Sequence, residues 1–180
     1  AYTAGIFEDG GSINLLKGGI AMADIINAVS PGFAKEITED QGGGGLDPFL
    51  RMRIHDLHGV LNGVDYDNWN PETDPLIPAN YSRNDLRGKA LCKRFLQENF
   101  GLEVSPRLPL FAVVSRLNVQ KGLDLIPPAL VNLLNRHAQF ILLGTGDSEL
   151  EKLFQDLAAS FPGRVGVHIA FSNELAHCIE

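Results

Sequence analysis

The spacing of hydrophobic positions changes at residue 101, and from there on short apolar runs alternate with amphipathic stretches. This alternation predicts a parallel β-sheet with helical crossovers, which is the front half of a nucleotide-binding α/β domain. The first apolar run, 108–114, is short and contains β-branched residues, so it predicts a strand buried in that sheet. The strands predicted in this part are 110–114, 140–143 and 165–170.

Capping signals predict the helices of the same part. Two adjacent prolines fit only in the first turn of a helix, so the first helix is predicted from near Pro127 to about residue 135. Ser148 and Glu151 stand in capping-box positions before the second helix, and Ser172 begins a third. The third helix meets no stop signal, so we expect it to continue beyond Glu180.

The first 66 residues carry shorter and less regular patterns. Ser12 is placed to cap a helix, and Ser30-Pro31 is a stronger start signal, because a hydroxyl cap precedes proline at the first helical position. Four consecutive glycines within 41–47 predict a loop. The other predictions are helices over 13–23, 31–38 and 48–54, strands over 25–29 and 57–61, and no strand within 1–11.

Prolines at three nearby positions after residue 70 indicate a surface linker between two portions of domains. A helix is predicted after this linker, beginning at Ser82 with Asp85 in its first turn and ending at Gly101. We therefore predict the end of one α/β domain in 1–66, an interdomain linker and helix in 67–106, and the start of a second α/β domain in 107–180.

Composition narrows the possible partners. The chain carries 15 Lys and Arg against 22 Asp and Glu, a net charge of −7, which disfavours a nucleic-acid partner. The apolar runs are far shorter than the roughly 20 residues of a membrane span, so no membrane partner is expected. Cys92 and Cys178 lie outside any CxxC pattern, which favours packed thiols. His55 and His58 have no third ligand nearby, and all five histidines are expected to be surface or packing residues, so no metal or cofactor is predicted.

The candidate chemistry gathers where the strand 110–114 ends. Arg116 and Lys121 follow that strand with a polar turn between them, and Gly122 comes directly after. Because ligands of open α/β sheets bind at the carboxyl ends of the strands, two cations at this place suit a diphosphate. Arginine grips phosphate oxygens with two parallel hydrogen bonds, and lysine supplies a point charge. From these residues alone, a pair of solvated loop cations is the alternative.

An ordered series of motifs also resembles one enzyme family, the bacterial glycogen synthases and plant starch synthases. The series runs in order over nearly all of the chain, and the order is more specific than any single motif. The motifs are 17–20 (KGGI), 23–24 (AD), 29–31 (VSP), 35–37 (KEI), 45–47 (GLD), 61–65 (LNGVD), 69–71 (WNP), 74–75 (DP), 115–117 (SRL), 120–124 (QKGLD) and 144–147 (GTGD).

This resemblance implies a GT-B fold, in which two Rossmann-like domains face each other across a cleft. It also implies transfer of glucose from an ADP-glucose donor to the non-reducing end of an α-1,4-glucan acceptor, with retention at the anomeric carbon and without a metal. Arg116 and Lys121 match the residues that hold the donor diphosphate, and Asn62 matches a residue near the cleft. Gly144 and Gly146 match a turn near the nucleotide, although a plain strand-to-helix turn is an equal alternative for them.

Two motifs of the family have no counterpart in the chain. One is a Lys-x-Gly-Gly motif near the family's N-terminus, and the other is a Glu-x7-Glu segment that holds a catalytically important glutamate. We therefore expect this chain to be an incomplete and inactive portion of a synthase. The resemblance places such a protein in the cytoplasm if it is bacterial, and in the plastid stroma if it comes from a plant or alga.

Two other functions stay open. One is a GT-B glycosyltransferase with a UDP-sugar donor, because such enzymes share the Arg…Lys arrangement, and the other is a non-catalytic segment that binds nucleotide or glucan. A dehydrogenase is disfavoured, because its GxGxxG should follow the first strand, whereas Gly144 and Gly146 follow the second. Trp69 is expected to pack the linker rather than stack on a sugar. Asp74 is expected to be an ordinary turn residue, as are the neighbouring aspartates.

Overall fold

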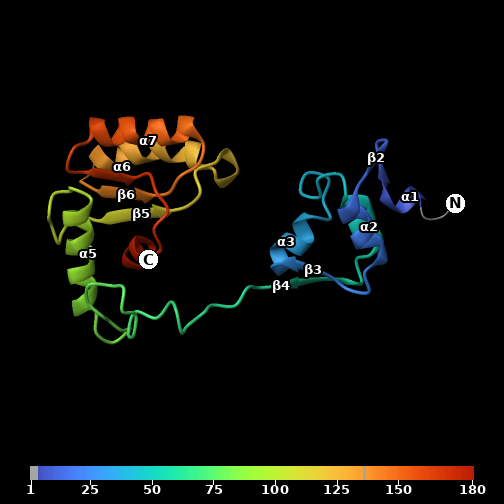
Figure 1. The fold of residues 1–180 in the computed structure, drawn as a ribbon, viewed down its shortest axis with the longest axis horizontal. Helices are drawn as coiled ribbons and strands as arrows, with labels where there is room; N and C mark the ends of the chain where they lie inside the picture. Colours follow the sequence, from blue (N-terminus) through green and yellow to red (C-terminus); the bar gives the residue numbers. More distant parts are fainter. Residues whose placement is uncertain (1–3, 136) are drawn as a thin grey trace. The chain divides into compact units, whose positions relative to one another are not determined.

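The computed structural model describes residues 4–135 and 137–180. Its contacts divide the chain into two compact units, with the boundary in the sequence between Val64 and Asp65. The N-terminal unit ends at Val64, and the C-terminal unit runs from Asp65 to Glu180 (Figure 1). The segment predicted as a linker therefore belongs, by its contacts, to the C-terminal unit. The domain boundaries set from the sequence stay a prediction.

The N-terminal unit is built around two short parallel strands. β3 and β4 pair in parallel from Ile26↔Leu57 to Val29↔Val60. Ile20, Leu46 and Leu50 form a small core. The elements of the N-terminal unit are α1 (Ala4–Phe7), β1 (Glu8–Asp9), β2 (Ser12–Ile13), α2 (Leu15–Met22), β3 (Ile26–Val29), α3 (Pro31–Glu36), α4 (Asp47–Met52) and β4 (Leu57–Val60).

Start signals in this unit were predicted with mixed success. Ser30 caps α3 as expected, because its hydroxyl accepts a hydrogen bond of 3.0 Å from the amide of Phe33. The prediction that Ser12 caps the first long helix is wrong, because Ser12 lies in β2 and the side chain of Asn14 caps α2 instead. The hairpin of β1 and β2 contradicts the absence of strands within 1–11.

A parallel sheet in the order β5-β6-β7 forms the centre of the C-terminal unit. Figure 1 shows α6 and α7 on one side of this sheet, and α5 and the C-terminal helix α8 on the other. The elements are α5 (Arg87–Asn99), β5 (Leu110–Val114), the 3-10 turns η1 (Val119–Lys121) and η2 (Leu123–Leu125), α6 (Ile126–Asn135), β6 (Gln139–Leu143), α7 (Ser148–Ser160), β7 (Val165–His168) and α8 (Asn173–Ile179).

The middle strand β6 carries the core, and all five of its residues are buried. Successive side chains of a strand point to opposite faces, so Phe140 and Leu142 pack in the cluster under α6 and α7 while Ile141 packs in the cluster beside α5 and α8. The prediction of a buried strand at 110–114 is wrong in one respect. β5 pairs only with β6 among the described strands, and its Phe111 is 44% exposed.

One helix start in this unit differs from the prediction, and another agrees with it. Ser82 and Asp85 form a turn with an isolated antiparallel bridge, so α5 begins at Arg87 and not at Ser82. The two prolines of α6 behave as expected, since that helix begins at Ile126 and holds them in its first turn. No helix within the described residues has the length and apolar character needed to cross a membrane.

Candidate functional site

A cavity of about 460 Å³ opens at the carboxyl edge of the β5-β6-β7 sheet. Its walls come from the ends of β5 and β6, from the loop before α8, and from Trp69 in the segment that precedes α5. Arg116 and Gly144 both line it, and we call it the Arg116 cavity. The sequence predicts a ligand site at this edge, because parallel strands end there side by side.

Two loops meet at the floor of this region, one after β5 and one after β6. Leu117 and Gly146 form an isolated parallel bridge, in which the amide of Leu117 donates to the carbonyl of Thr145 at 3.1 Å. The amide of Asp147 donates to the carbonyl of Leu117 at 2.7 Å. These bonds extend the pairing of the strands beyond their ends and hold the backbone beside Arg116 in place.

The predicted glycines have a packing role in this contact. A Cβ atom on Gly144 would lie 1.9 Å from the carbonyl oxygen of Ser115, and one on Gly146 would lie 2.0 Å from that of Leu117. Real Cβ contacts are never so short, and the atoms in the way are backbone, which cannot turn aside as a side chain can. Any larger residue at either position forces the two loops apart.

Glu151 secures the same loop from the first turn of α7. Its Oε1 accepts hydrogen bonds from the amide of Gly146 at 2.9 Å and from the hydroxyl of Thr145 at 2.7 Å. These bonds, that of the Gly146 amide first, lower the pKa of the Glu151 carboxyl below its ordinary value. The prediction that Ser148 caps α7 is thus wrong, because Asp147 is the N-cap residue. Glu151 bonds to the loop before the helix and not to Ser148.

The two predicted cations differ in their relation to the cavity. Arg116 is exposed, lines the cavity, and forms no salt bridge with any acidic group of the described residues. Lys121 is also exposed but ends the turn η1 and is not among the residues that line the cavity. Gly122 follows it with φ of 66°, a left-handed conformation that glycine adopts easily.

Asn62 is the predicted site residue that lies in the N-terminal unit, where it follows β4 and is exposed. The structure therefore brings Arg116 and Gly144 to one cavity, with Gly146 in the adjoining bridge. Lys121 follows a few residues later on the same loop, and Asn62 belongs to the other unit.

Phe171 is a cavity residue that was not predicted from the sequence. It lies in the loop between β7 and α8, lines the Arg116 cavity, and is 90% exposed. A large apolar ring that packs against so little of its own chain is available to a ligand. Its position one residue before the helix cap Ser172 was the available signal, because loops at the carboxyl edge of such sheets carry the binding residues.

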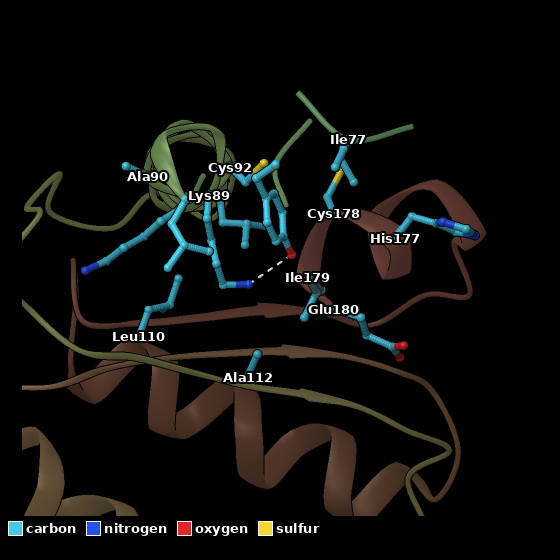
Figure 2. A pocket seen from close by; sticks show the side chains of 14 residues that line it. Ile77, Lys89, Ala90, Cys92, Leu110, Ala112, His177, Cys178, Ile179 and Glu180 are labelled. Carbon is cyan, nitrogen blue, oxygen red and sulfur yellow. Dashed lines mark hydrogen bonds between the residues drawn. The ribbon is translucent and has the colours of Figure 1, made fainter. Parts of the chain in front are cut away.

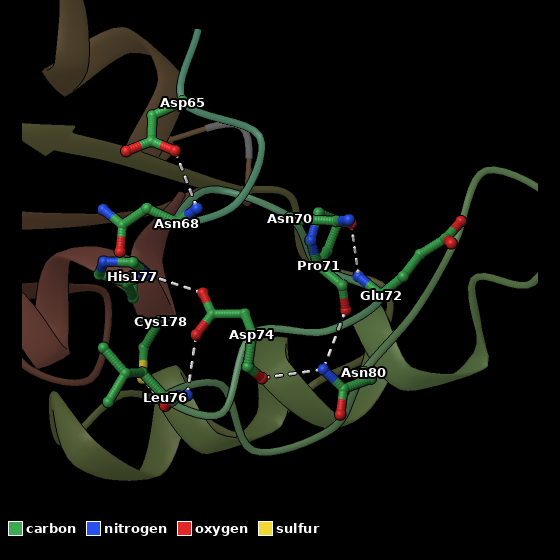
Figure 3. Close-up of polar contacts among 10 residues, drawn as sticks. All are labelled: Asp65, Asn68, Asn70, Pro71, Glu72, Asp74, Leu76, Asn80, His177 and Cys178. Carbon is green, nitrogen blue, oxygen red and sulfur yellow. Dashed lines mark hydrogen bonds and ion pairs between the residues drawn. The ribbon is translucent and has the colours of Figure 1, made fainter.

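A second missed feature is a buried hydrogen bond between side chains far apart in the sequence. Oδ2 of Asp74 lies 2.7 Å from Nδ1 of His177, and the two residues are only 7% and 4% exposed (Figure 3). Asp74 is a turn residue as predicted, since its Oδ1 accepts from the amide of Leu76 at 2.8 Å. Its other oxygen attaches the turn to α8, which a local pattern cannot reveal.

Trp69 belongs to the same cluster. Its ring stacks on that of His177 with the centroids 3.9 Å apart and the planes 7° from parallel. The prediction that Trp69 packs is confirmed, but Trp69 also lines the Arg116 cavity. Packing and ligand contact are therefore not alternatives for this residue.

A second cavity, of about 380 Å³, lies between α5 and α8 (Figure 2). Lys89 donates a hydrogen bond of 3.0 Å to the hydroxyl of Tyr81 in its wall, and Cys92 and Cys178 also line it. Both cysteines are free thiols, as predicted. None of the predicted site residues lines this cavity. Among the described residues, no group of three or more His, Cys, Asp or Glu is placed to hold a metal ion.

Comparison with known proteins gives consistent relatives. The family model of the starch synthase catalytic domain matches residues 1–52. Glycogen synthase of Anaeromyxobacter sp. (strain Fw109-5) is 49% identical over 179 residues, which cover 99% of this chain and 37% of that protein. Glycogen synthase 1 of Geobacter metallireducens is 46% identical over 173 residues, which cover 96% of this chain and 34% of that protein.

A solved structure is similar along nearly the whole chain. The catalytic domain of starch synthase IV from Arabidopsis thaliana, bound to ADP and acarbose, matches with a TM-score of 0.89 and 34% identity. The match covers 96% of this chain and 36% of that one. With the parallel sheets described above, it defines an α/β protein of GT-B type that contains parts of two Rossmann-like domains. The chain belongs to the family of glycogen synthases and starch synthases, and it spans 34–37% of the length of the two bacterial relatives.

Proposed function

We propose that this chain is part of a glucan synthase that transfers glucose from ADP-glucose to the non-reducing end of an α-1,4-glucan, with retention at the anomeric carbon. The proposal is supported by the family, whose bacterial members in the comparison are glycogen synthases. It is also supported by the starch synthase IV structure, which is bound to ADP and acarbose. The observation that carries it is Arg116, an exposed cation that has no salt-bridge partner in the described part of the chain and lines a cavity at the carboxyl edge of the sheet.

The proposed role of the two cations follows from the chemistry of the leaving group. Negative charge grows on the diphosphate of ADP as the bond to glucose breaks. Arg116 and Lys121 interact more strongly with that charge than with the bound donor, and such a difference lowers the barrier to reaction. Arg116 offers a planar fork for two phosphate oxygens, and Lys121 is a movable point charge on the same loop. With two cations of the protein at the diphosphate, the proposed reaction uses no metal and no cofactor.

The other proposed contacts surround these cations. Gly144 and Gly146 keep the backbone after β6 against the loop that carries Arg116, so the diphosphate meets backbone rather than side chains. The exposed ring of Phe171 in the same cavity suits stacking on the flat base of the nucleotide. Asn62 of the N-terminal unit is proposed as a further substrate-binding residue, as the family resemblance implies.

Variants of the full-length synthase that contains these residues test the proposal. A hydrogen bond to a charged group contributes roughly 1.5–3 kcal/mol, so Arg116→Ala and Lys121→Ala should each lower glucose transfer about 10–100-fold. Arg107→Ala is the matched control, because Arg107 is an exposed cation of the same unit that does not line the cavity. The measurement is incorporation of labelled glucose into glycogen, with thermal unfolding to show that each variant is folded. Unchanged kinetics in both cation variants would reject the site.

The same assay separates the proposed donor from its alternative. ADP-glucose and UDP-glucose share the diphosphate and the sugar, so Arg116 and Lys121 serve either donor equally and only the base differs. We expect faster transfer from ADP-glucose than from UDP-glucose, because ADP-glucose is the proposed donor. A preference for UDP-glucose would keep the role of the two cations and change the substrate.

A further inference from the structure

A buried contact attaches the segment that precedes α5 to the last helix of the C-terminal unit. Asp74 in this segment and His177 on α8 are 103 positions apart, yet their side chains meet at 2.7 Å (Figure 3). A second bond supports the turn, since the side-chain amide of Asn80 donates to the backbone carbonyl of Asp74 at 2.8 Å. The turn before α5 is thus fixed to the last helix.

Packing alone does not account for a histidine at this place. Asp74 accepts hydrogen bonds on both oxygens, so the Nδ1 of His177 is the donor in the pair. Its Nε2 is then buried, and it has no hydrogen-bond partner among the described residues. An apolar side chain would fill the same space without an unsatisfied nitrogen, which costs free energy when it is buried. The imidazole joins the Asp74 carboxylate to the aromatic ring that stacks on its face.

The ring that stacks on the imidazole is that of Trp69. The imidazole lies parallel to the indole at 3.9 Å, and its orientation is fixed by the bond to Asp74. Trp69 lines the Arg116 cavity together with Phe171, so one face of the indole packs on His177 while the residue still contributes to the cavity wall. The order of contacts is therefore Asp74, His177, Trp69 and then the cavity.

We propose that Trp69 is a contact residue for the nucleoside diphosphate sugar, and that Asp74 and His177 are positioning residues that hold it there. This inference rests on the proposed function of the Arg116 cavity. The contact is with the nucleoside diphosphate part of the ligand, which ADP shares with the donor, and a ring held from behind loses little conformational entropy when the ligand binds.

Trp69 is the single tryptophan of the chain, so the intrinsic tryptophan fluorescence reports on this residue alone. Titration of the 180-residue chain with ADP should change the Trp69 fluorescence in a saturable way, with the same dissociation constant that calorimetry gives for ADP. Asp74→Asn and His177→Phe should raise that constant 3–10-fold, because the indole is no longer held in one orientation. Asp156→Asn and His55→Phe alter the same residue types at exposed positions outside the cavity and should leave it unchanged.

The outcomes separate this inference from the function on which it rests. If calorimetry shows ADP binding while the Trp69 fluorescence of the wild type stays constant, the inference is overturned and the proposed function stands. If calorimetry detects no binding of ADP, both are overturned. The titration of the wild type needs no variant, so it tests the contact between Trp69 and the ligand even if Asp74→Asn or His177→Phe does not fold. A folded Asp74→Asn chain with the wild-type constant would overturn the positioning role.

Discussion

At the scale of single residues, the site depends as much on the absence of side chains as on their presence. Arg116 supplies the charge, but Gly144 and Gly146 let the neighbouring loop approach the backbone that carries it. Their identity is required by backbone oxygens about 2 Å from a Cβ position. The sequence suggested a turn near the nucleotide, and the structure adds the packing reason for glycine at both positions.

Gly146→Ala tests this packing role. The added Cβ meets the carbonyl oxygen of Leu117, and the loops must separate, which destabilises the protein by roughly 1–3 kcal/mol, the usual cost of overpacking. Gly19→Ala in α2 is the matched control, since its Cβ meets nothing within 4 Å and alanine favours a helix. Urea unfolding measures both changes. Equal stability of Gly146→Ala and the wild type would contradict the close contact between the loops.

At the scale of elements, regular hydrophobic patterns were sufficient to predict helices and strands. Weak local patterns and contacts between distant segments could not be predicted from the sequence. The five longer strands and the helices α3, α6 and α8 lie close to their predicted positions, because each carries an apolar run or a cap of its own. The β1–β2 hairpin escaped prediction, since its strands have two exposed residues each. Arg116 and the glycines could be found from their place after strands, whereas the pair of Asp74 and His177 depends on a fold that joins distant segments.

The attachment of α8 to the turn at Asp74 should depend on pH. Burial by itself raises the pKa of Asp74, but hydrogen bonds from His177 and from the amide of Leu76 outweigh it, and the pKa lies below the ordinary 3.8. A carboxyl with a lowered pKa stabilises the folded state fully above its unfolded value. This contribution is lost as the pH falls from about 4 through the folded pKa, because the carboxylate becomes protonated.

Asp74→Asn should therefore lower the free energy of unfolding by roughly 1.5–3 kcal/mol at pH 7, which is the contribution of a hydrogen bond to a charged group. The difference from the wild type should shrink as the pH falls below 4. Urea unfolding at pH 7 and at successively lower pH, followed by the fluorescence of Trp69, measures it. A difference that stays constant over this range would show that the charge of Asp74 does not stabilise the attachment.

At the scale of the whole molecule, the chain contains a candidate donor site, while two motifs expected from the family resemblance have no counterpart in it. It spans 34–37% of the length of the two bacterial relatives. The Glu-x7-Glu segment that the family uses has no counterpart among the 180 residues. Binding of the nucleotide and transfer of glucose are therefore expected to separate in this chain, because they depend on different groups.

We predict that the 180-residue chain binds ADP but does not elongate glycogen when it is supplied with ADP-glucose. The cavity that holds Arg116 is formed within residues 65–180, so its proposed contacts with ADP are all present in this chain. The family resemblance implies that transfer also requires a glutamate of the Glu-x7-Glu segment, which has no counterpart among these residues, and loss of a group that acts in the transition state lowers the rate without abolishing ground-state binding. Calorimetry with ADP and incorporation of labelled glucose test the two halves of this prediction on one sample. Incorporation above the level of an Arg116→Ala control would show that the catalytic group lies within these residues.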